Sequence, residues 1–113
     1  MRVVRDARDA GIKAAVLSNS LGRAPFDPYA AWDLTGNFDV VVLSHEVGIR
    51  KPDPAIYRLT AERMGLKPAE CVFADDTEIN LETAVTLGMT PVYSLEEDIL
   101  AARLRLALGL PRR

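Results

Sequence analysis

The sequence has one cysteine, no excess of basic residues and no long apolar run, and each shortage excludes a class of protein. Cys71, as the only cysteine, cannot form a disulfide within the chain. No apolar run approaches the ~20 residues that are needed to cross a bilayer. Arg2 and Arg5 lie in a helical pattern instead of preceding the apolar segment of a signal peptide. We therefore expect a cytoplasmic protein with no membrane partner.

Basic residues do not outnumber acidic ones, because the sequence has 14 Lys and Arg residues and 16 Asp and Glu residues. The net charge of -2 leaves no basic stripe that could follow a phosphate backbone, so nucleic acid is not an expected partner. The patterns GxGxxG and GxxxxGK[ST] are both absent, which argues against dinucleotide and P-loop sites.

With 113 residues, 49% of them hydrophobic, the chain is expected to form a single domain over residues 1–113. Four short apolar runs are typical of buried parallel strands: 12–17, 39–43, 71–74 and 91–93. Helical patterns alternate with them: 3–10, 28–34, 54–64, 79–87 and 95–108. This alternation predicts a doubly wound α/β sheet.

Helix boundaries carry recognisable capping residues. Asp53 followed by Pro54 predicts an N-cap with proline at the first helical position, and Ser94 with Glu97 predicts a capping box. Helices are expected to stop at two glycines, Gly88 and Gly109.

Ser18 and Asn19 directly follow the first apolar strand, at the carboxyl edge where open α/β sheets bind ligands. Their hydroxyl and amide groups could donate hydrogen bonds to a phosphoryl oxygen. A simple turn is the alternative interpretation of this dipeptide.

Lys51 lies in the segment VGIRKPDPAIY, where Pro52 and Pro54 stiffen the backbone just before a helix. A lysine held in this way can present a compact positive charge to an anion. The alternative is a solvated lysine in a helix-entry loop.

Asp75 and Asp76 lie side by side in VFADDTEINLETAVTLGM, where a strand ends and a helix begins. Adjacent carboxylates repel each other unless a cation or a helix N-terminus compensates. Their hard oxygens suit Mg²⁺, and Asn80, near one turn into the helix, could orient them. Either aspartate, or Thr77, could instead simply cap the helix.

His45 has no serine, cysteine or second histidine at a recognisable spacing, and the thiol of Cys71 is expected to be inert. The remaining polar sites occur in the order Ser-Asn, Lys and Asp-Asp, each near the carboxyl end of a strand. In a parallel sheet they could converge. A response-regulator receiver domain uses similar residues in the reverse order.

These motifs resemble the haloacid dehalogenase superfamily, specifically the C-terminal part of its Rossmann-like core, over essentially all of the chain. The branch that looks closest contains phosphatase-like hydrolases and the N-terminal domains of soluble epoxide hydrolases. The resemblance implies a three-layer Rossmann-like parallel sheet. It also implies that Ser18 and Lys51 hold the transferring phosphoryl group, with Asn19 beside them, and that Asp75 and Asp76 bind Mg²⁺ as cofactor.

The family's first motif, an Asp-x-Asp on the first strand, does not occur in this sequence. The resemblance implies that this motif supplies the nucleophile and the general acid. Losing a nucleophile costs on the order of 10³ to 10⁶ in rate, so we expect this chain alone to be inactive. The first strand is central in the family, and without it the strands at 12–17 and 71–74 should expose unpaired edges. The cap that follows this strand in the family is expected to be missing as well.

Three interpretations follow from this gap. The first is a truncated hydrolase domain whose family reaction is Mg²⁺-dependent phosphoester hydrolysis, through an aspartyl-phosphate, of a small phosphorylated molecule. The second is a non-catalytic interaction module that completes its sheet as a homo-oligomer or with a complementing chain. The third is a fragment of a longer gene product.

Overall fold

The computed structural model describes residues 2–19 and 34–111, which alternate between helices and short parallel strands. In chain order the elements are α1 (Arg2–Asp9), β1 (Ala15–Ser18), α2 (Leu34–Asn37), β2 (Val40–Leu43), α3 (Ser44–Val47), α4 (Pro54–Met64), η1 (Pro68–Glu70), β3 (Val72–Asp75), α5 (Glu78–Thr86), β4 (Thr90–Tyr93) and α6 (Glu97–Leu108). The helix predicted over 28–34 lies outside the described residues, apart from Leu34. The predicted α/β class is confirmed.

Helix α4 begins and ends where the sequence predicts. The carboxylate of Asp53 accepts a hydrogen bond from the Ala55 N–H at 2.9 Å, and Pro54 occupies the first helical position. Gly65 ends the helix with a φ of 72°, a left-handed conformation that glycine adopts without strain. Helix α6 likewise stops at Gly109, as predicted.

The predicted capping box at Ser94 and Glu97 is wrong. The Ser94 hydroxyl accepts a hydrogen bond from the Glu96 N–H at 3.0 Å and donates one to the Glu96 carbonyl at 3.1 Å. These local bonds form a turn, so α6 begins two residues later than predicted, at Glu97.

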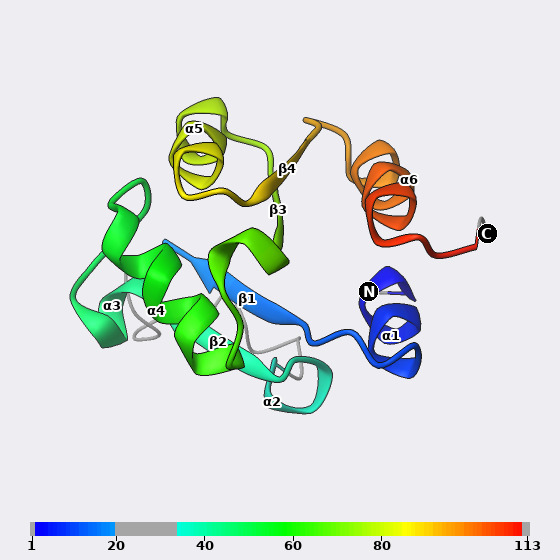
Figure 1. Cartoon of the computed structure of the whole chain (residues 1–113), viewed down its shortest axis with the longest axis horizontal. Helices are drawn as coiled ribbons and strands as arrows, with labels where there is room; N and C mark the ends of the chain where they lie inside the picture. Colours follow the sequence, from blue (N-terminus) through cyan, green and yellow to red (C-terminus); the bar gives the residue numbers. More distant parts are fainter. Residues whose placement is uncertain (1, 20–33, 112–113) are drawn as a thin grey trace, which may run out of the picture.

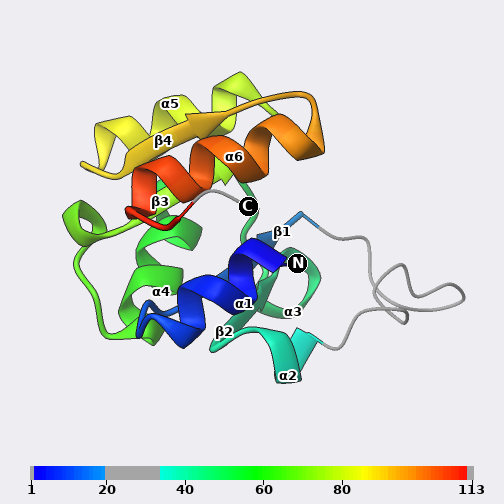
Figure 2. The same ribbon diagram turned by 90° about the vertical axis from the view of Figure 1, so that its right-hand side faces the viewer.

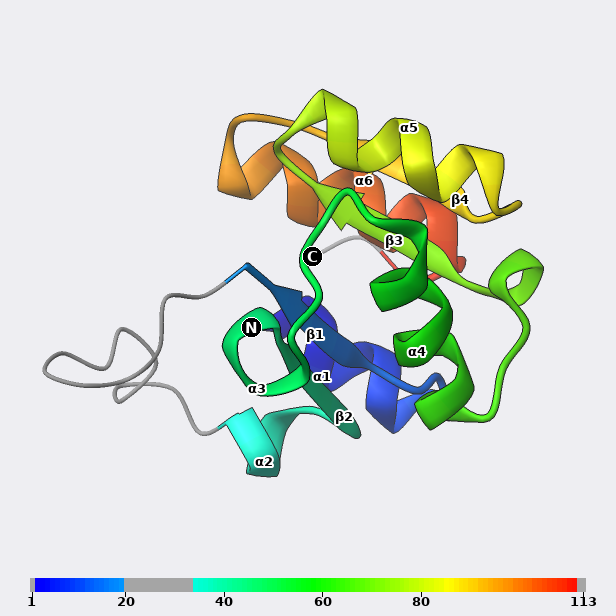
Figure 3. The same cartoon turned by 90° about the vertical axis from the view of Figure 1, so that its left-hand side faces the viewer.

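Helices cover the strands on both sides (Figure 1). Helices α1 and α6 lie on one side, as Figure 2 shows, and α4 and α5 lie on the other, as Figure 3 shows. Strand β1 pairs with β2 in parallel, and β3 pairs with β4 in parallel. The predicted three-layer, Rossmann-like arrangement with parallel strands is therefore present.

Among the described residues the strands form two separate two-stranded sheets, because β1 and β3 do not pair with each other. Both strands were predicted to be buried, yet every residue of β1 and the first three of β3 are only half-buried. By contrast, Val42 and Leu43 of β2 are fully buried. The expected unpaired edges of β1 and β3 are thus present, and they explain the incomplete burial.

A cavity of about 310 Å³ lies between these two edges, and we call it the central cavity. Strands β1 and β3 line it together with α1, α4 and α6. The lining includes Val16, Phe73, Met64 and Leu104, so the cavity is largely apolar.

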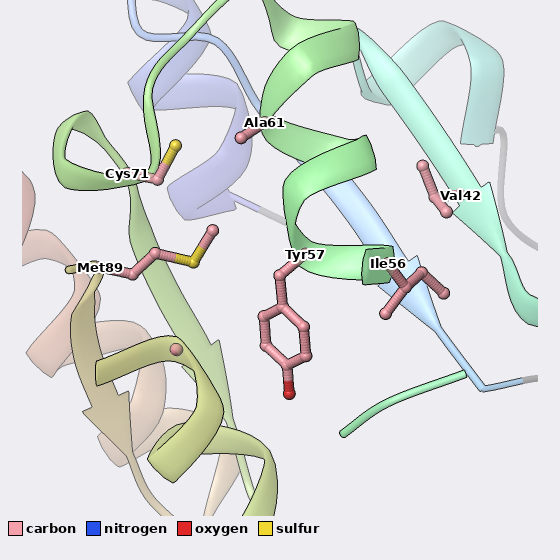
Figure 4. Packing of buried hydrophobic residues seen from close by; sticks show 7 residues of the cluster. Val42, Ile56, Tyr57, Ala61, Cys71 and Met89 are labelled. Carbon is pink, nitrogen blue, oxygen red and sulfur yellow. The ribbon is translucent and has the colours of Figure 1, made fainter. Parts of the chain in front are cut away.

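Three kinds of contact join the two sheets. The main core cluster packs around α4 (Figure 4) and comprises Val42, Ile56, Tyr57, Ala61, Cys71, Ala84 and Met89. The buried Tyr57 hydroxyl donates to the Asn80 carbonyl at 2.7 Å, which ties α4 to α5. Arg105 of α6 forms an ion pair with Asp6 of α1 at 2.8 Å. Helix packing and side-chain contacts therefore join the two sheets, which share no strand pairing within the described residues.

Within residues 2–19 and 34–111, no helix has both the length and the apolar character needed to cross a membrane.

Candidate functional site

The carboxyl ends of β1 and β3 meet at the loop that precedes α4. Asn19 follows β1 and bonds to the backbone of Lys51 in that loop. The Lys51 ammonium in turn contacts Asp75, the last residue of β3. The predicted convergence of the three polar segments is therefore seen as a chain of contacts.

The Asp75 side chain is buried, and both of its carboxylate oxygens accept hydrogen bonds. Its Oδ2 accepts from the Lys51 Nζ at 2.8 Å and from the Asn80 Nδ2 at 3.3 Å. Its Oδ1 accepts from the Thr77 N–H at 2.9 Å. The Lys51 and Asp75 side chains retain only 11% and 7% of their exposure, so this ion pair is buried.

Two opposing effects set the pKa of Asp75. Burial alone raises it, because a carboxylate loses hydration when it is enclosed. The hydrogen bond and charge of Lys51, helped by Thr77 and Asn80, outweigh burial and hold the pKa below its usual value of 3.8. Asp75 is therefore ionised at neutral pH.

Asp76 is exposed to solvent, whereas its neighbour Asp75 is buried. One of its oxygens accepts from the Thr77 hydroxyl at 3.2 Å. Thr77 occupies the N-cap of α5 but makes no side-chain capping bond. Because neither aspartate occupies the N-cap and the Thr77 side chain makes no cap bond, capping does not account for the acid pair.

The Lys51–Pro52 segment is held from two directions. The Asn19 amide donates to the Lys51 carbonyl at 3.1 Å and accepts from the Lys51 N–H at 2.8 Å. The Thr83 hydroxyl donates to the Pro52 carbonyl at 2.9 Å. Sequence reasoning missed Thr83, because a threonine on a helix, 31 residues away, carries no signal of this contact.

Replacing Asn19 with alanine is expected to loosen this segment without unfolding the protein, since Asn19 is exposed. One hydrogen bond contributes about 1 kcal/mol, so exchange of the Lys51 amide should be several-fold faster in Asn19→Ala. NMR-detected hydrogen exchange measures this directly. Asn19→Asp retains the acceptor and should keep most of the protection. Unchanged Lys51 exchange in Asn19→Ala would contradict the assignment.

The structure also shows where Ser18 lies, and where two residues without a predicted role, His45 and Cys71, lie. Ser18 ends β1 opposite Leu43 and is half-buried at the same sheet edge. His45 is exposed in α3, and burial raises the pKa of the Cys71 thiol, which keeps it protonated. In the part of the chain that the structure describes, no three His, Cys, Asp or Glu residues form a metal-binding group. Asp75 and Asp76 could thus supply only part of a coordination shell.

Comparison with known proteins identifies relatives that include phosphatases. The chain is 34% identical over 110 residues to acyl-CoA dehydrogenase family member 10 of Mus musculus, covering 97% of this chain and 10% of the relative. It is 31% identical over 88 residues to a phosphorylated carbohydrates phosphatase of Thermotoga maritima, covering 78% and 41%. The chain therefore spans less than half the length of these curated relatives.

Solved structures share the fold. An uncharacterised protein of Corynebacterium glutamicum matches with a TM-score of 0.87 and 28% identity, over 99% of this chain and 82% of its own. A haloacid dehalogenase family enzyme of Bacteroides thetaiotaomicron, in complex with magnesium and inorganic phosphate, matches with a TM-score of 0.65 and 28% identity, over 80% and 48%. The family model of haloacid dehalogenase-like hydrolases matches residues 1–88. The chain belongs to the haloacid dehalogenase-like hydrolase family.

Proposed function

We propose that this chain provides the phosphate-binding half and part of the metal-binding half of a Mg²⁺-dependent phosphoester hydrolase. The observation that carries the proposal is the buried Lys51–Asp75 pair at the carboxyl edge of the strands. It places a fixed cation, which can stabilise phosphoryl charge, beside a fixed carboxylate, which can help to hold a metal ion.

Each residue has a proposed role that follows from its position. Ser18 and Lys51 would donate to phosphoryl oxygens, and Lys51 would also offset their negative charge. Asn19, predicted to bind phosphate, holds the Lys51 backbone and so fixes where that charge lies. Asn80 orients Asp75 through its amide.

Asp75 and Asp76 offer the hard carboxylate oxygens that Mg²⁺ prefers, with waters and substrate oxygens completing its shell. When bound, the ion would neutralise charge on the phosphoryl group. In the metal-bound protein, the exposed Asp76 can reach the ion without breaking an ion pair within the described residues, whereas Asp75 would share its charge with Lys51.

The substrate class is a small phosphorylated molecule, and the 113 residues alone are proposed to be inactive because they contain no Asp-x-Asp. A cytoplasmic location and a single domain over residues 1–113 belong to the same proposal. The relatives named for phosphatase activity support the reaction class.

Complementation tests the reaction class. A synthetic peptide with an apolar strand followed by Asp-x-Asp is added to the chain in Mg²⁺, and hydrolysis of p-nitrophenyl phosphate is followed. Turnover should appear only with the peptide, and should be lost when its first aspartate becomes asparagine or in the chain variant Asp76→Asn. Peptide binding without turnover would contradict the proposed reaction.

A second candidate function is a non-catalytic interaction module. The separation of the strands into two sheets with an intervening cavity favours it. If this second function is correct, the chain variant Asp76→Asn would leave partner binding intact. No phosphoester would be hydrolysed, with or without the Asp-x-Asp peptide.

A further inference from the structure

We infer that Thr83 is a positioning residue, whose hydroxyl fixes the backbone beside Lys51 and so sets where the charge of that lysine lies relative to Asp75. This role deepens the proposed function and rests on it for the effect on phosphate binding. It belongs to the hydroxyl alone, so substitutions that keep the shape of the side chain can test it.

The loop that carries Lys51 is anchored at two consecutive residues. Asn19 bonds to both the N–H and the carbonyl of Lys51. The half-buried Thr83 donates its hydroxyl to the carbonyl of the next residue, Pro52, at 2.9 Å. Because a misplacement of about 1 Å can cost a site on the order of 10²-fold in rate, an anchor next to a charged group has functional weight.

Helix α5 holds the lysine loop and the acid with side chains from one turn. Asn80 and Thr83 are three residues apart, which places them on the same face of the helix. Asn80 donates to the Oδ2 of Asp75 at 3.3 Å, while Thr83 donates to Pro52. A single rigid helical turn therefore sets the separation between the lysine loop and the carboxylate.

Tyr57 fixes this turn of α5 from the core. Its side chain is fully buried, and its hydroxyl donates to the Asn80 carbonyl at 2.7 Å. The same hydroxyl is within hydrogen-bonding range of the Thr83 side chain. Burial and the charge of Asp75 raise the pKa of Tyr57 to about 12, so the hydroxyl stays a donor at neutral pH. The turn cannot rotate without breaking a buried hydrogen bond, which is costly.

The Lys51 ammonium occupies a place that depends on this geometry. It contacts the Oδ2 of Asp75 at 2.8 Å and lies 5.8 Å from the centre of the Phe73 ring. The Phe73 ring in turn packs against Tyr57, with 5.0 Å between the ring centres. A shift of the loop would weaken the contact with the carboxylate and the contact with the ring together.

Three substitutions separate the hydroxyl of Thr83 from its shape. Thr83→Val keeps the shape and removes the donor, whereas Thr83→Ser keeps the donor and removes a methyl group. Thr86→Val is the matched control, because it makes the same change on the same helix at an exposed position. There the hydroxyl bonds to the Glu82 carbonyl one turn earlier, at 3.0 Å, and not to the lysine loop.

The first measurement is the exchange of the Lys51 ammonium protons with water, followed by NMR in EDTA. In Thr83→Val this exchange should be about fivefold faster, which corresponds to one hydrogen bond, and it should be unchanged in the other two variants. The second is the dissociation constant of inorganic phosphate in Mg²⁺, which should rise about fivefold in Thr83→Val alone. Urea denaturation should give similar midpoints for Thr83→Val and Thr86→Val, so a merely structural role would not produce these changes.

Faster ammonium exchange and weaker phosphate binding in Thr83→Val, with both preserved in Thr83→Ser and Thr86→Val, support the inference. Equal losses in Thr83→Ser overturn it in favour of methyl packing, and equal losses in Thr86→Val overturn it in favour of a general effect on the helix. Unchanged ammonium exchange in Thr83→Val overturns it, as does faster exchange with unchanged phosphate affinity. If the unmodified chain binds no phosphate, the proposed function fails, and ammonium exchange alone supports or overturns the positioning of Lys51.

Discussion

Replacing Lys51 with methionine is expected to destabilise the protein by about 3–5 kcal/mol at pH 7, because it leaves the buried carboxylate of Asp75 without its cation. Methionine keeps an apolar side chain of similar length, so the loss is mainly electrostatic. The free energy of unfolding, measured by urea denaturation in EDTA, reports it. A cost below about 1 kcal/mol would show that the pair behaves like an exposed salt bridge.

The pH dependence of this cost has a defined sign. In the unmodified chain the pKa of Asp75 lies below 3.8, so the stability it contributes is complete above that pH and is lost as pH falls through the lowered pKa. Without Lys51, the effect of burial, which raises the pKa, is opposed only by Thr77 and Asn80. The pKa of Asp75 in Lys51→Met therefore rises, and protonation relieves part of the destabilisation.

The difference in unfolding free energy between the two proteins should therefore shrink as pH falls from 7 to 4. Lys51→Met/Asp75→Asn provides the matched control, since a neutral amide replaces the unpaired charge and should restore much of the stability. If the single variant does not fold, the double variant still tests the argument. A difference that stays constant with pH would contradict it.

Replacing Ile56 with alanine is expected to cost about 2–5 kcal/mol, since its side chain is fully buried in the core cluster around α4. Ile56 lies three residues after Asp53, whose carbonyl accepts its N–H at 3.2 Å. Alanine keeps this backbone bond at the start of α4, so the cost reports the lost side-chain packing.

Ile79→Ala is the matched control, because it makes the same chemical change at a helical residue that is 52% exposed. Its cost should stay within about 0.5 kcal/mol. Urea denaturation of both variants measures the contrast. Equal costs would mean that α4 does not carry the core that joins the two sheets.

Local signals in the sequence were reliable where one interaction dominates. Helix α4 follows its prediction because Asp53, Pro54 and Gly65 act within their own turns. The Ser94 prediction failed because its hydroxyl bonds two residues ahead instead of capping a helix. Strand β1 begins three residues late, since the Ile12 N–H closes helix α1 by bonding to the Ala7 carbonyl.

In the candidate site, too, some features could be predicted from the sequence and others could not. Convergence of the Ser-Asn, Lys and Asp-Asp segments was predictable, because parallel strands place their carboxyl ends at one edge. The contacts that hold Lys51 were not predictable. They join its segment to Asn19 and Thr83, which are 32 and 31 residues from their partners and are of types common in turns and helices.

The burial of the strands could not be predicted from local pattern. Apolar runs such as those of β1 and β3 are typical of buried strands. Their burial depends on a neighbour on each side, and within the described residues each has only one. Only the family resemblance and its missing motif predicted the open edges.

Hydrolysis of p-nitrophenyl phosphate by the 113-residue chain alone, in Mg²⁺, tests most directly whether this chain holds only part of a catalytic site. The account predicts no turnover above the buffer background, because the sequence contains no Asp-x-Asp to supply the nucleophile for Lys51, Asp75 and Asp76. Asp76→Asn, at an exposed position, serves as the control that leaves folding intact. Turnover by the unmodified chain that Asp76→Asn abolishes would contradict the account.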